Sequence, residues 1–229
     1  MRGVQVSAPA RRPPGRPPAD EGPAATDDEI LGAALEAFAE SGYAATSVRQ
    51  LARRLGVSHN LLPQRFGSKE RLWYAAVDHG FAALAEAARF EIAAGDSIET
   101  IRRLIIRFIE GTATQPALLR IIGQEATHPG PRLDHLYDRY IGPTTRSVER
   151  GLEHLYRAGR ARHVPTAAFY FLLTHGAAGP LAMGPLAGHF GPPVSAEDPD
   201  GLHEYAAAVA DLLLHGIADT APARRRLRR

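Results

Sequence analysis

The stretch TSVRQLARRLGVSHNLLPQRFGSKERLW, residues 46–73, contains a short amphipathic helix, a tight turn and a second short helix rich in polar side chains. Four apolar residues recur at the i, i+3, i+4, i+7 spacing of a helix with one buried face: Val48, Leu51, Ala52 and Leu55. Gly56 is suited to end this helix, because glycine adopts the left-handed conformation without strain. A second helix is expected from Ser58 to about Phe66, and Ser68 can cap the next one.

Two short helices joined by a tight turn are the plan of a helix-turn-helix element, in which the second helix enters the major groove of DNA. Asn60 and Gln64 can each form two hydrogen bonds with adenine, and Arg65 can contact guanine or a phosphate. Hydroxyls, a lysine and helix amides around this segment can hold phosphates. The predicted DNA-binding residues are Thr46, Ser47, Ser58, His59, Asn60, Gln64, Arg65 and Lys69.

Pro63 lies inside the second helix, where it cannot donate a hydrogen bond to the carbonyl four residues before it. If Ser58 is the N-cap, Pro63 is the fifth helical residue, and a proline in a helix interior costs ~3 kcal/mol. If Asn60 is the N-cap, Pro63 is the third, where the amide has no intrahelical partner. The proline therefore predicts a shortened recognition helix in which Gln64 and Arg65 carry more of the contact.

The rest of the chain repeats helical apolar spacing and contains no strand pattern, so the predicted fold is all-α. Thr26 and Glu29 have the spacing of a capping box at the start of the first helix. A three-helix helix-turn-helix domain is expected to join a C-terminal helical bundle. The expected divisions are a disordered arm (1–25), the DNA-binding domain (26–72), the bundle (73–219) and a disordered basic tail (220–229).

Charge is distributed unevenly along the chain. Residues 1–75 have a net charge of +2, residues 76–223 have −5, and residues 224–229 contain five arginines. Basic ends on an acidic body suit a polyanionic partner at one end. Arg11, Arg12 and Arg16 of the N-terminal arm could lie in a minor groove, with a solvated leader as the alternative.

Catalytic and metal chemistry find little support in the sequence. Cysteine is absent, which excludes a disulfide framework and a thiolate metal site. Glu125 and His128 have the i, i+3 spacing of metal ligands in helical bundles, but the motif has no second copy. No Walker loop or GxSxG motif is present, so we expect no enzyme activity, no metal site and no cofactor.

A membrane span is not expected, and the protein is expected to be cytoplasmic. Residues 163–196 lack Asp, Glu, Lys and Arg, and the stretch AAFYFLLTHGAAGPLAMGPLAG within them has spanning length, but Pro180, Pro185, four glycines and His175 interrupt it. A buried helix followed by a loop fits this segment better.

Residues 46–73 resemble the signature of TetR-family transcriptional regulators, and the helix that begins at Thr26 extends the resemblance over residues 26–75. The matching positions are Thr46, Leu51, Ala52, Gly56, Val57, Ser58, Leu62, Phe66, Ser68, Lys69, Glu70 and Leu72. The family usually has an aromatic residue where Pro63 stands. The resemblance implies a homodimer that binds a palindromic double-stranded operator and acts as a ligand-released repressor. A helical adaptor that binds protein through residues 165–217, without sequence-specific DNA binding, is the alternative.

The C-terminal bundle is expected to bind a small, largely apolar effector between its helices, because its helices supply more large apolar residues than a dimer interface requires. The predicted lining is Ile101, Ile105, Phe108, Leu119, Ile122, Tyr137, Phe169, Leu172 and His175. A filled core with a satisfied His175 is the alternative.

The last helix has two apolar flanks, of which a monomer can cover only one. We therefore expect a homodimer through residues 165–178 and 202–217, packed as a four-helix bundle. The predicted dimer contacts are Phe171, Tyr205, Val209, Leu213, Leu214 and Ile217.

Overall fold

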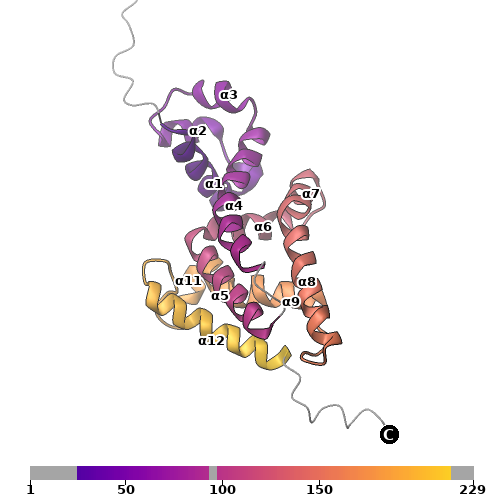
Figure 1. Ribbon diagram of the computed structural model, residues 1–229. Coiled ribbons are helices and arrows are strands. Elements are labelled where there is room, and N and C mark those ends of the chain that lie inside the picture. The colour runs from indigo at the N-terminus through magenta and orange to yellow at the C-terminus, as the bar shows by residue number, and fades with distance from the viewer. Residues whose placement is uncertain (1–24, 93–96, 218–229) are drawn as a thin grey trace, which may run out of the picture.

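The computed structural model describes residues 25–92 and 97–217, which form helices joined by short loops with no strand among them (Figure 1). The all-α prediction is confirmed. The helices are α1 (Asp27–Ala45), α2 (Val48–Arg54), α3 (Leu61–Phe66), α4 (Lys69–Ile92), α5 (Ile98–Thr114), α6 (Pro116–Glu125), α7 (Pro131–Leu136), the π-helical turn η1 (Tyr137–Ile141), α8 (Gly142–Arg157), α9 (Thr166–Phe171), the π-helical turn η2 (Leu172–Ala177), α10 (Gly179–Ala182), α11 (Gly184–Ala187) and α12 (Pro199–Ile217).

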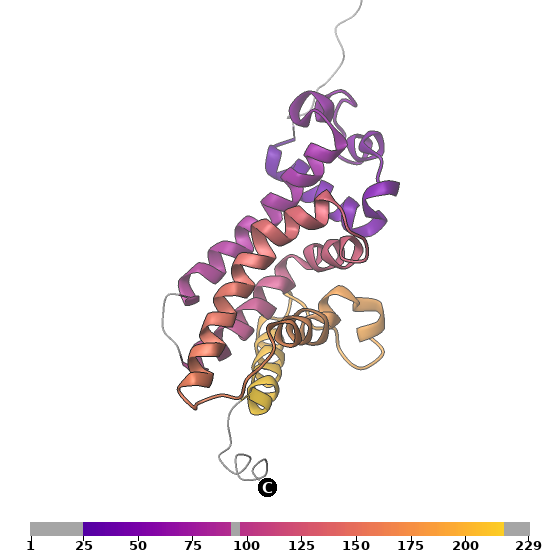
Figure 2. The same ribbon diagram turned by 90° about the vertical axis from the view of Figure 1, so that its right-hand side faces the viewer.

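The first three helices and the start of α4 form one end of the molecule (Figures 1 and 2). Thr26 and Glu29 make the expected capping box, with Glu29 donating its amide to the Thr26 hydroxyl at 3.2 Å and Thr26 donating its amide to the Glu29 carboxylate at 2.8 Å. α1 bends at Gly42, which has a φ of +74°. Large side chains from all four helices fill the core between them: Ile30, Leu35, Phe38, Leu51, Leu62, Leu72 and Trp73.

The turn between α2 and α3 is built as the sequence predicts. Gly56 has a φ of +67°, and the Val57 amide donates to the carbonyl of Ala52 at 3.0 Å, which is the Schellman arrangement. α3 begins only at Leu61, with Asn60 as its N-cap. Pro63 is thus the third helical residue, where no intrahelical bond is lost, and the shortened-helix prediction is confirmed.

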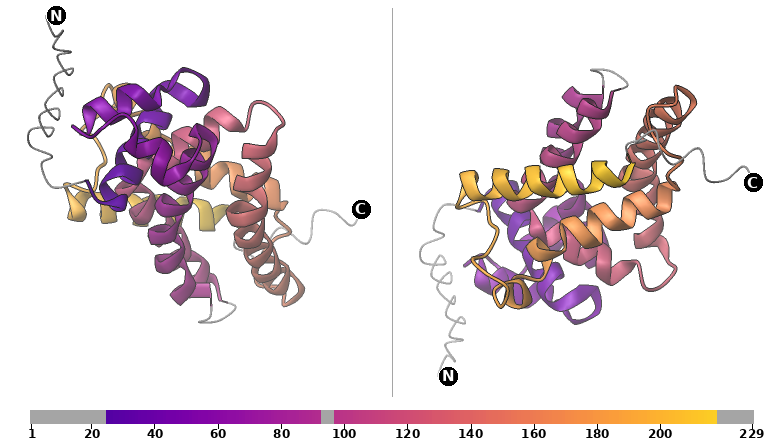
Figure 3. Two further views of the ribbon diagram at one scale, coloured as in Figure 1. Left: turned by 90° about the horizontal axis from the view of Figure 1, so that it is seen from above. Right: turned by 90° about the horizontal axis from the view of Figure 1, so that it is seen from below.

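The remaining helices form the body of the protein. α12 packs along α5, and two contacts of 2.7 Å join the helices: an ion pair between Arg102 and Asp211 and a hydrogen bond between His203 and Glu110. α12 and the α9–η2 segment lie beside each other on the underside of the body (Figure 3, right). The last helix begins at Pro199, before the expected position 202, and two one-turn helices occupy residues 179–187, part of which was expected to be loop.

A π-helical turn, η1, precedes Pro143. Proline has no amide hydrogen, so the backbone hydrogen bonds of the helix change register before it. The Gly142 amide donates to the carbonyl of Tyr137, five residues back, instead of four. A second π-helical turn, Leu172–Ala177, continues α9, where a regular helix was expected. Both π-helical turns lie beside the internal cavity described below.

No helix within residues 25–92 and 97–217 combines the length and the apolar character that a bilayer crossing requires. The predicted disordered arm (1–25), except for Ala25, lies outside the described residues. So do positions 218–229, which include the basic tail, and with the arm the arginines proposed for a minor groove.

Three helices meet at Gly80 of α4. A Cβ at this position would lie 2.8 Å from Leu35 of α1 and 3.1 Å from Leu118 of α6, and both leucines are buried. A methyl group there has to displace packed side chains. Gly32 of α1, by contrast, has open space around the position that a Cβ would take, with no atom within 4 Å, and can accept one.

We expect Gly80→Ala to destabilise the protein by about 1 kcal/mol or more, because overpacking outweighs the gain in helix propensity. Gly32→Ala should instead be neutral or stabilising by up to ~1 kcal/mol. Urea denaturation measures both free energies of unfolding. Equal stabilisation by the two alanines would contradict the close approach at Gly80.

Candidate nucleic-acid interface and internal cavity

The turn and recognition helix present a polar surface at the far end of the molecule from α12 (Figure 1). Ser58, His59, Asn60 and Gln64 are all exposed. The Gln64 amide makes the first intrahelical bond of α3, to the carbonyl of Asn60 at 3.0 Å, which fixes the side chain on a regular helix. Four of the predicted DNA-binding residues therefore lie together on one accessible segment.

Two hydroxyls flank this segment at helix N-termini. Ser47 caps α2 by accepting the Gln50 amide at 3.4 Å, and Ser68 caps α4 by accepting the Arg71 amide at 3.1 Å. A capping hydroxyl accepts a hydrogen bond and keeps its own proton, so it can still donate to a phosphate oxygen. The cap expected at Ser68 is therefore present, with the first amides of α4 beside it.

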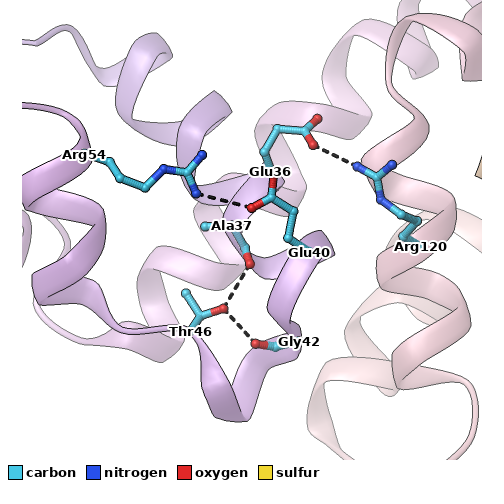
Figure 4. Close-up of polar contacts among 7 residues, drawn as sticks. All are labelled: Glu36, Ala37, Glu40, Gly42, Thr46, Arg54 and Arg120. Carbon is cyan, nitrogen blue, oxygen red and sulfur yellow. Dashed lines mark hydrogen bonds and ion pairs between the residues drawn. The ribbon is translucent and has the colours of Figure 1, made fainter.

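Thr46 does not lie on this surface, which corrects its predicted role. Its side chain is only 7% exposed, and its hydroxyl lies 2.7 Å from the carbonyl of Gly42 and 3.1 Å from that of Ala37 (Figure 4). The hydroxyl ties the end of α1 to the start of α2. The bend of α1 at Gly42 brings these carbonyls to Thr46, and sequence spacing alone does not show that bend.

Arg65 and Lys69 lie beside the surface but are already bound within the protein. Arg65 donates to the Asp27 carboxylate at 2.9 Å and to the carbonyl of Ala25 at 2.8 Å. Lys69 donates to the carbonyl of Ala44 at 3.1 Å, above the ring of Tyr43. Partial burial and the positive charge of Arg132 lower the pKa of Lys69. An ammonium has three hydrogens, so Lys69 retains donors for a phosphate.

Two arginines of α2 were not among the predicted DNA contacts. Arg49 and Arg53 are exposed, one turn apart. Arg54, next to them, instead pairs with Glu40 of α1 at 3.3 Å (Figure 4). Arg49 and Arg53 have the i, i+4 spacing of neighbours on one helix face, and this spacing is the sequence signal that could have identified them.

A cavity of about 400 Å³, partly open to solvent, lies in the body among α4, α5, α6, the η1–α8 segment and the α9–η2 segment. This volume is within the range of small-molecule sites in proteins. Its wall is mostly apolar, and four of the predicted residues contribute to it: Phe108, Leu119, Ile122 and Phe169.

The other five predicted lining residues lie elsewhere. Ile101 and Ile105 are buried in the core between α5 and α12, while Tyr137, Leu172 and His175 are exposed. His175 lies within the second π-helical turn, where the wider turn moves side chains away from the positions that a regular helical count gives. The wall instead includes Phe81, Leu84, Leu104, Leu118, Ile141, Val148 and Leu173.

The predicted dimer residues are also largely internal. Leu214 and Ile217 are buried against α5, and Tyr205, Val209 and Leu213 are partly buried against the same core. Of the predicted set, Phe171 remains exposed, at 58%. The apolar side chain that α12 presents outward is Leu212, which is 75% exposed.

Polar contacts connect the wall of the cavity to α4. Asp78 of α4 accepts hydrogen bonds from Tyr140 at 2.6 Å and from His135 at 2.7 Å. Burial raises the pKa of Tyr140 and the hydrogen bond to Asp78 raises it further, so the phenol stays a donor. The Tyr140 ring also stacks on Phe81 of α4 at 4.1 Å.

A second connection joins α1 to α6. Arg120 of α6 donates to Glu36 of α1 at 2.8 Å, and Gln124 of α6 donates to the carbonyl of Ala39 at 2.8 Å (Figure 4 shows the first pair). The helix-turn-helix end is therefore held to the wall of the cavity by α4 and by α6.

Within the described part of the chain, no three His, Asp or Glu side chains come together as a metal site requires. Glu125, weighed above as a metal ligand, is paired with Arg132 at 2.9 Å.

This arrangement defines a helix-turn-helix protein with a cavity-containing helical body. Residues 30–76 match the family model described as bacterial regulatory proteins, tetR family. Over 50 residues the chain is 50% identical to the HTH-type transcriptional repressor Rv3405c of Mycobacterium tuberculosis, a span of 22% of this chain and 27% of that protein. Over 106 residues it is 26% identical to the HTH-type transcriptional repressor NicS of Pseudomonas putida, a span of 46% of this chain and 50% of that one.

The chain therefore aligns with between about a quarter and a half of the length of these curated relatives. The crystal structure of the TetR family transcriptional regulator PfmR from Thermus thermophilus matches with a TM-score of 0.61 and 26% identity, over 85% of this chain and 98% of PfmR. The TetR-family resemblance is thus confirmed. Residues 30–76 match the tetR-family model over a helix-turn-helix domain, and the body has the fold of TetR-family regulators.

We expect Thr46→Val to lower the free energy of unfolding by about 1–2 kcal/mol. Valine has the same shape as threonine but lacks the buried hydroxyl, so the two carbonyls that the hydroxyl contacts lose a hydrogen-bond donor. Ser47→Ala, its neighbour at the α2 N-cap, should cost about 1 kcal/mol. Thermal or urea unfolding measures both effects. A Thr46→Val protein as stable as the parent would contradict the internal role of the hydroxyl.

Proposed function

We propose that the protein is a sequence-specific DNA-binding transcriptional regulator, acting as a homodimeric repressor that a small molecule releases from its operator. The observation that carries the proposal is the exposed polar segment 58–64, carried on a helix-turn-helix domain that matches the TetR family. The curated relatives that share this domain are named as transcriptional repressors. The alternative, a helical adaptor that does not bind specific DNA, does not account for the exposed polar surface of the helix-turn-helix domain.

In the proposed complex Asn60 and Gln64 contact base edges, and Ser47, Ser58, His59, Ser68 and Lys69 hold the flanking phosphates. Arg49 and Arg53 are added as further phosphate contacts because both are exposed on α2. Arg65 is assigned a positioning role, since its guanidinium fixes the end of α3 against the start of α1. A palindromic operator matches the two-fold symmetry of a dimer.

Two variants separate base reading from phosphate binding. Gln64→Ala should weaken binding to the operator by about 1–3 kcal/mol and leave binding to random DNA unchanged. Arg49→Gln should weaken both uniformly and reduce the slope of log K against log salt by about 1. Gel shift or fluorescence anisotropy on the DNA upstream of the protein's own gene measures these affinities at several salt concentrations.

Arg157→Gln is the matched control, because it removes the same charge from an exposed pair with Glu153 at the far end of α8. It should leave DNA binding unchanged. Equal affinity of the parent protein for the upstream DNA and for random DNA would overturn sequence-specific recognition and favour the adaptor.

The cavity is proposed as the effector site. Its wall includes Phe81 of α4 and Leu118 of α6, the two helices that hold the helix-turn-helix end. A ligand shifts the position of that end only if it binds one arrangement of these helices more tightly than the other. An occupied cavity that repositions α4 would change the separation of the two recognition helices in a dimer.

The dimer is proposed to form through the outward faces of α9–η2 and α12. These segments lie beside each other, since the Tyr205 hydroxyl of α12 donates to the carbonyl of Ala177 at 2.6 Å. Phe171, Leu172 and Leu212 expose more than half of their surface on these segments. Large apolar side chains exposed on two neighbouring segments favour a protein–protein interface there.

We expect Leu212→Glu to dissociate the dimer, because the carboxylate would be buried unpaired at the interface. Light scattering coupled to size exclusion at micromolar concentration measures the mass. Tyr156→Glu, at an exposed aromatic of α8, is the control and should remain dimeric. Leu214→Glu is unsuitable for this test, because Leu214 is only 6% exposed and belongs to the monomer core. A monomeric parent would contradict the proposed assembly.

A further inference from the structure

Both charged side chains among the described residues that line the cavity are cationic. Among the described residues that line it, the side chains that carry a formal charge are Arg107 of α5 and Arg139 of η1, with no Asp, Glu, Lys or His. A wall with two cations and no anion attracts a negatively charged ligand and repels a positively charged one.

Both arginines remain available to a ligand. Arg107 lies 3.6 Å from Glu110, one turn further along α5, and Arg139 lies 3.8 Å from the Asp78 carboxylate. These are the long end of ion-pair distances, and each guanidinium is more than half exposed. Glu110 and Asp78 each have a closer partner, since His203 lies 2.7 Å from Glu110 and Tyr140 lies 2.6 Å from Asp78. A ligand anion therefore has to compete only with weak ion pairs in order to bind Arg107 and Arg139.

Three threonine hydroxyls of the cavity wall have hydrogen-bond partners and a fourth has none, which also favours a ligand that carries oxygen. Thr144, Thr145 and Thr174 each donate to the carbonyl four residues back. Thr112 lines the cavity, is 3% exposed, and its hydroxyl has no hydrogen-bond partner within the described chain. A rotation of about 120° around χ1 would move the hydroxyl to another staggered position, from which it can donate to a ligand oxygen. Buried hydroxyls ordinarily have partners, so this one marks a place for an acceptor.

The size of the cavity limits the ligand. At about 30 Å³ for each water-sized group, about 400 Å³ holds roughly a dozen methylene-sized groups. The remainder of the wall is aliphatic and aromatic, from Leu84, Phe108, Leu119, Val148 and Phe169 among others. A hydrocarbon body fits this lining, and a polyanion such as a free nucleotide does not.

We infer that the effector is an apolar monocarboxylate of about ten carbons, with its hydrocarbon in the cavity and its carboxylate between Arg107 and Arg139. The inference rests on the proposed effector role of the cavity and names its ligand class. Arg139 belongs to η1, whose next residue, Tyr140, binds Asp78 of α4. A carboxylate that draws Arg139 toward the cavity acts directly on the contact that joins η1 to α4.

The experiment compares three probes of equal chain length by calorimetric titration of the full chain without DNA, below their micelle concentrations. The probes are decanoate, 1-decanol and decylammonium. Decanoate should bind at least tenfold more tightly than decylammonium, with 1-decanol between them. The double variant R107Q/R139Q should weaken decanoate about tenfold or more and leave 1-decanol within twofold.

Two further variants serve as controls. Arg157→Gln removes one charge far from the cavity and should leave the order of the probes unchanged. Val148→Phe reduces the space inside and should weaken all three probes together. Equal affinity for decanoate and decylammonium, absence of binding by all three, or decanoate binding that survives Val148→Phe would overturn the inference.

Because these titrations contain no DNA, their failure leaves the DNA-binding proposal intact. The gel-shift measurement in turn fails or succeeds without any ligand. If decanoate binds as expected but does not change operator affinity, the ligand class stands and the release mechanism fails.

Discussion

The contact of α1, α4 and α6 around Gly80 is the constraint on which the rest of the structure depends. Only a glycine lets Leu35 and Leu118 approach the α4 backbone from two sides, at 2.8 and 3.1 Å from a would-be Cβ. This contact lies in an apolar core that runs from Ile30 of α1 to Leu136 of α7. The core therefore does not end at residue 72, where the sequence suggests a domain boundary. Motion of the recognition helix relative to α4 would have to disrupt a close-packed core, which resists small deformations.

The consequence is that the helix-turn-helix end moves as a unit with the first half of α4. Trp73 and Leu72, near the start of α4, are fully buried between the helices of the DNA-binding end. The Lys69–Ala44 and Arg65–Asp27 contacts close the same unit from outside. A signal from the body must therefore displace this unit as a whole. The polar contacts of Asp78 and of Glu36, each shared with the body, are the places where such a displacement changes an interaction.

Sequence patterns predicted the structure of the helix-turn-helix end better than that of the cavity, because the structure of the helix-turn-helix end is determined by residues close together in the chain. The Schellman turn at Gly56 and the tolerance of Pro63 depend on residues close by in the chain. The role of Thr46 was missed because the bend of α1 brings its partner, Ala37, near. In the cavity, Phe108 and Leu119 lie on regular helices, where a period of 3.6 residues places side chains correctly. The exposed Tyr137 and Leu172 are the first residues of the two π-helical turns, and His175 lies inside the second, where the wider turn rotates each later side chain. Pro143, two residues past the end of the first turn, makes that turn visible in the sequence because it interrupts the hydrogen-bond ladder there.

Both π-helical turns border the cavity, and this location affects how the body could respond to a ligand. η1 and η2 both contribute to the cavity wall, through Tyr140 and Ile141 on one side and Leu173 and Thr174 on the other. η2 ends beside the Tyr205–Ala177 hydrogen bond to α12, and η1 ends beside the Asp78 contact to α4. A π-helical turn has a competing α-helical arrangement of similar length, so a change of ladder register is a discrete alternative. Filling the cavity against these two turns would thus act at once on the helix that carries the DNA-binding end and on the helix proposed to form the dimer interface.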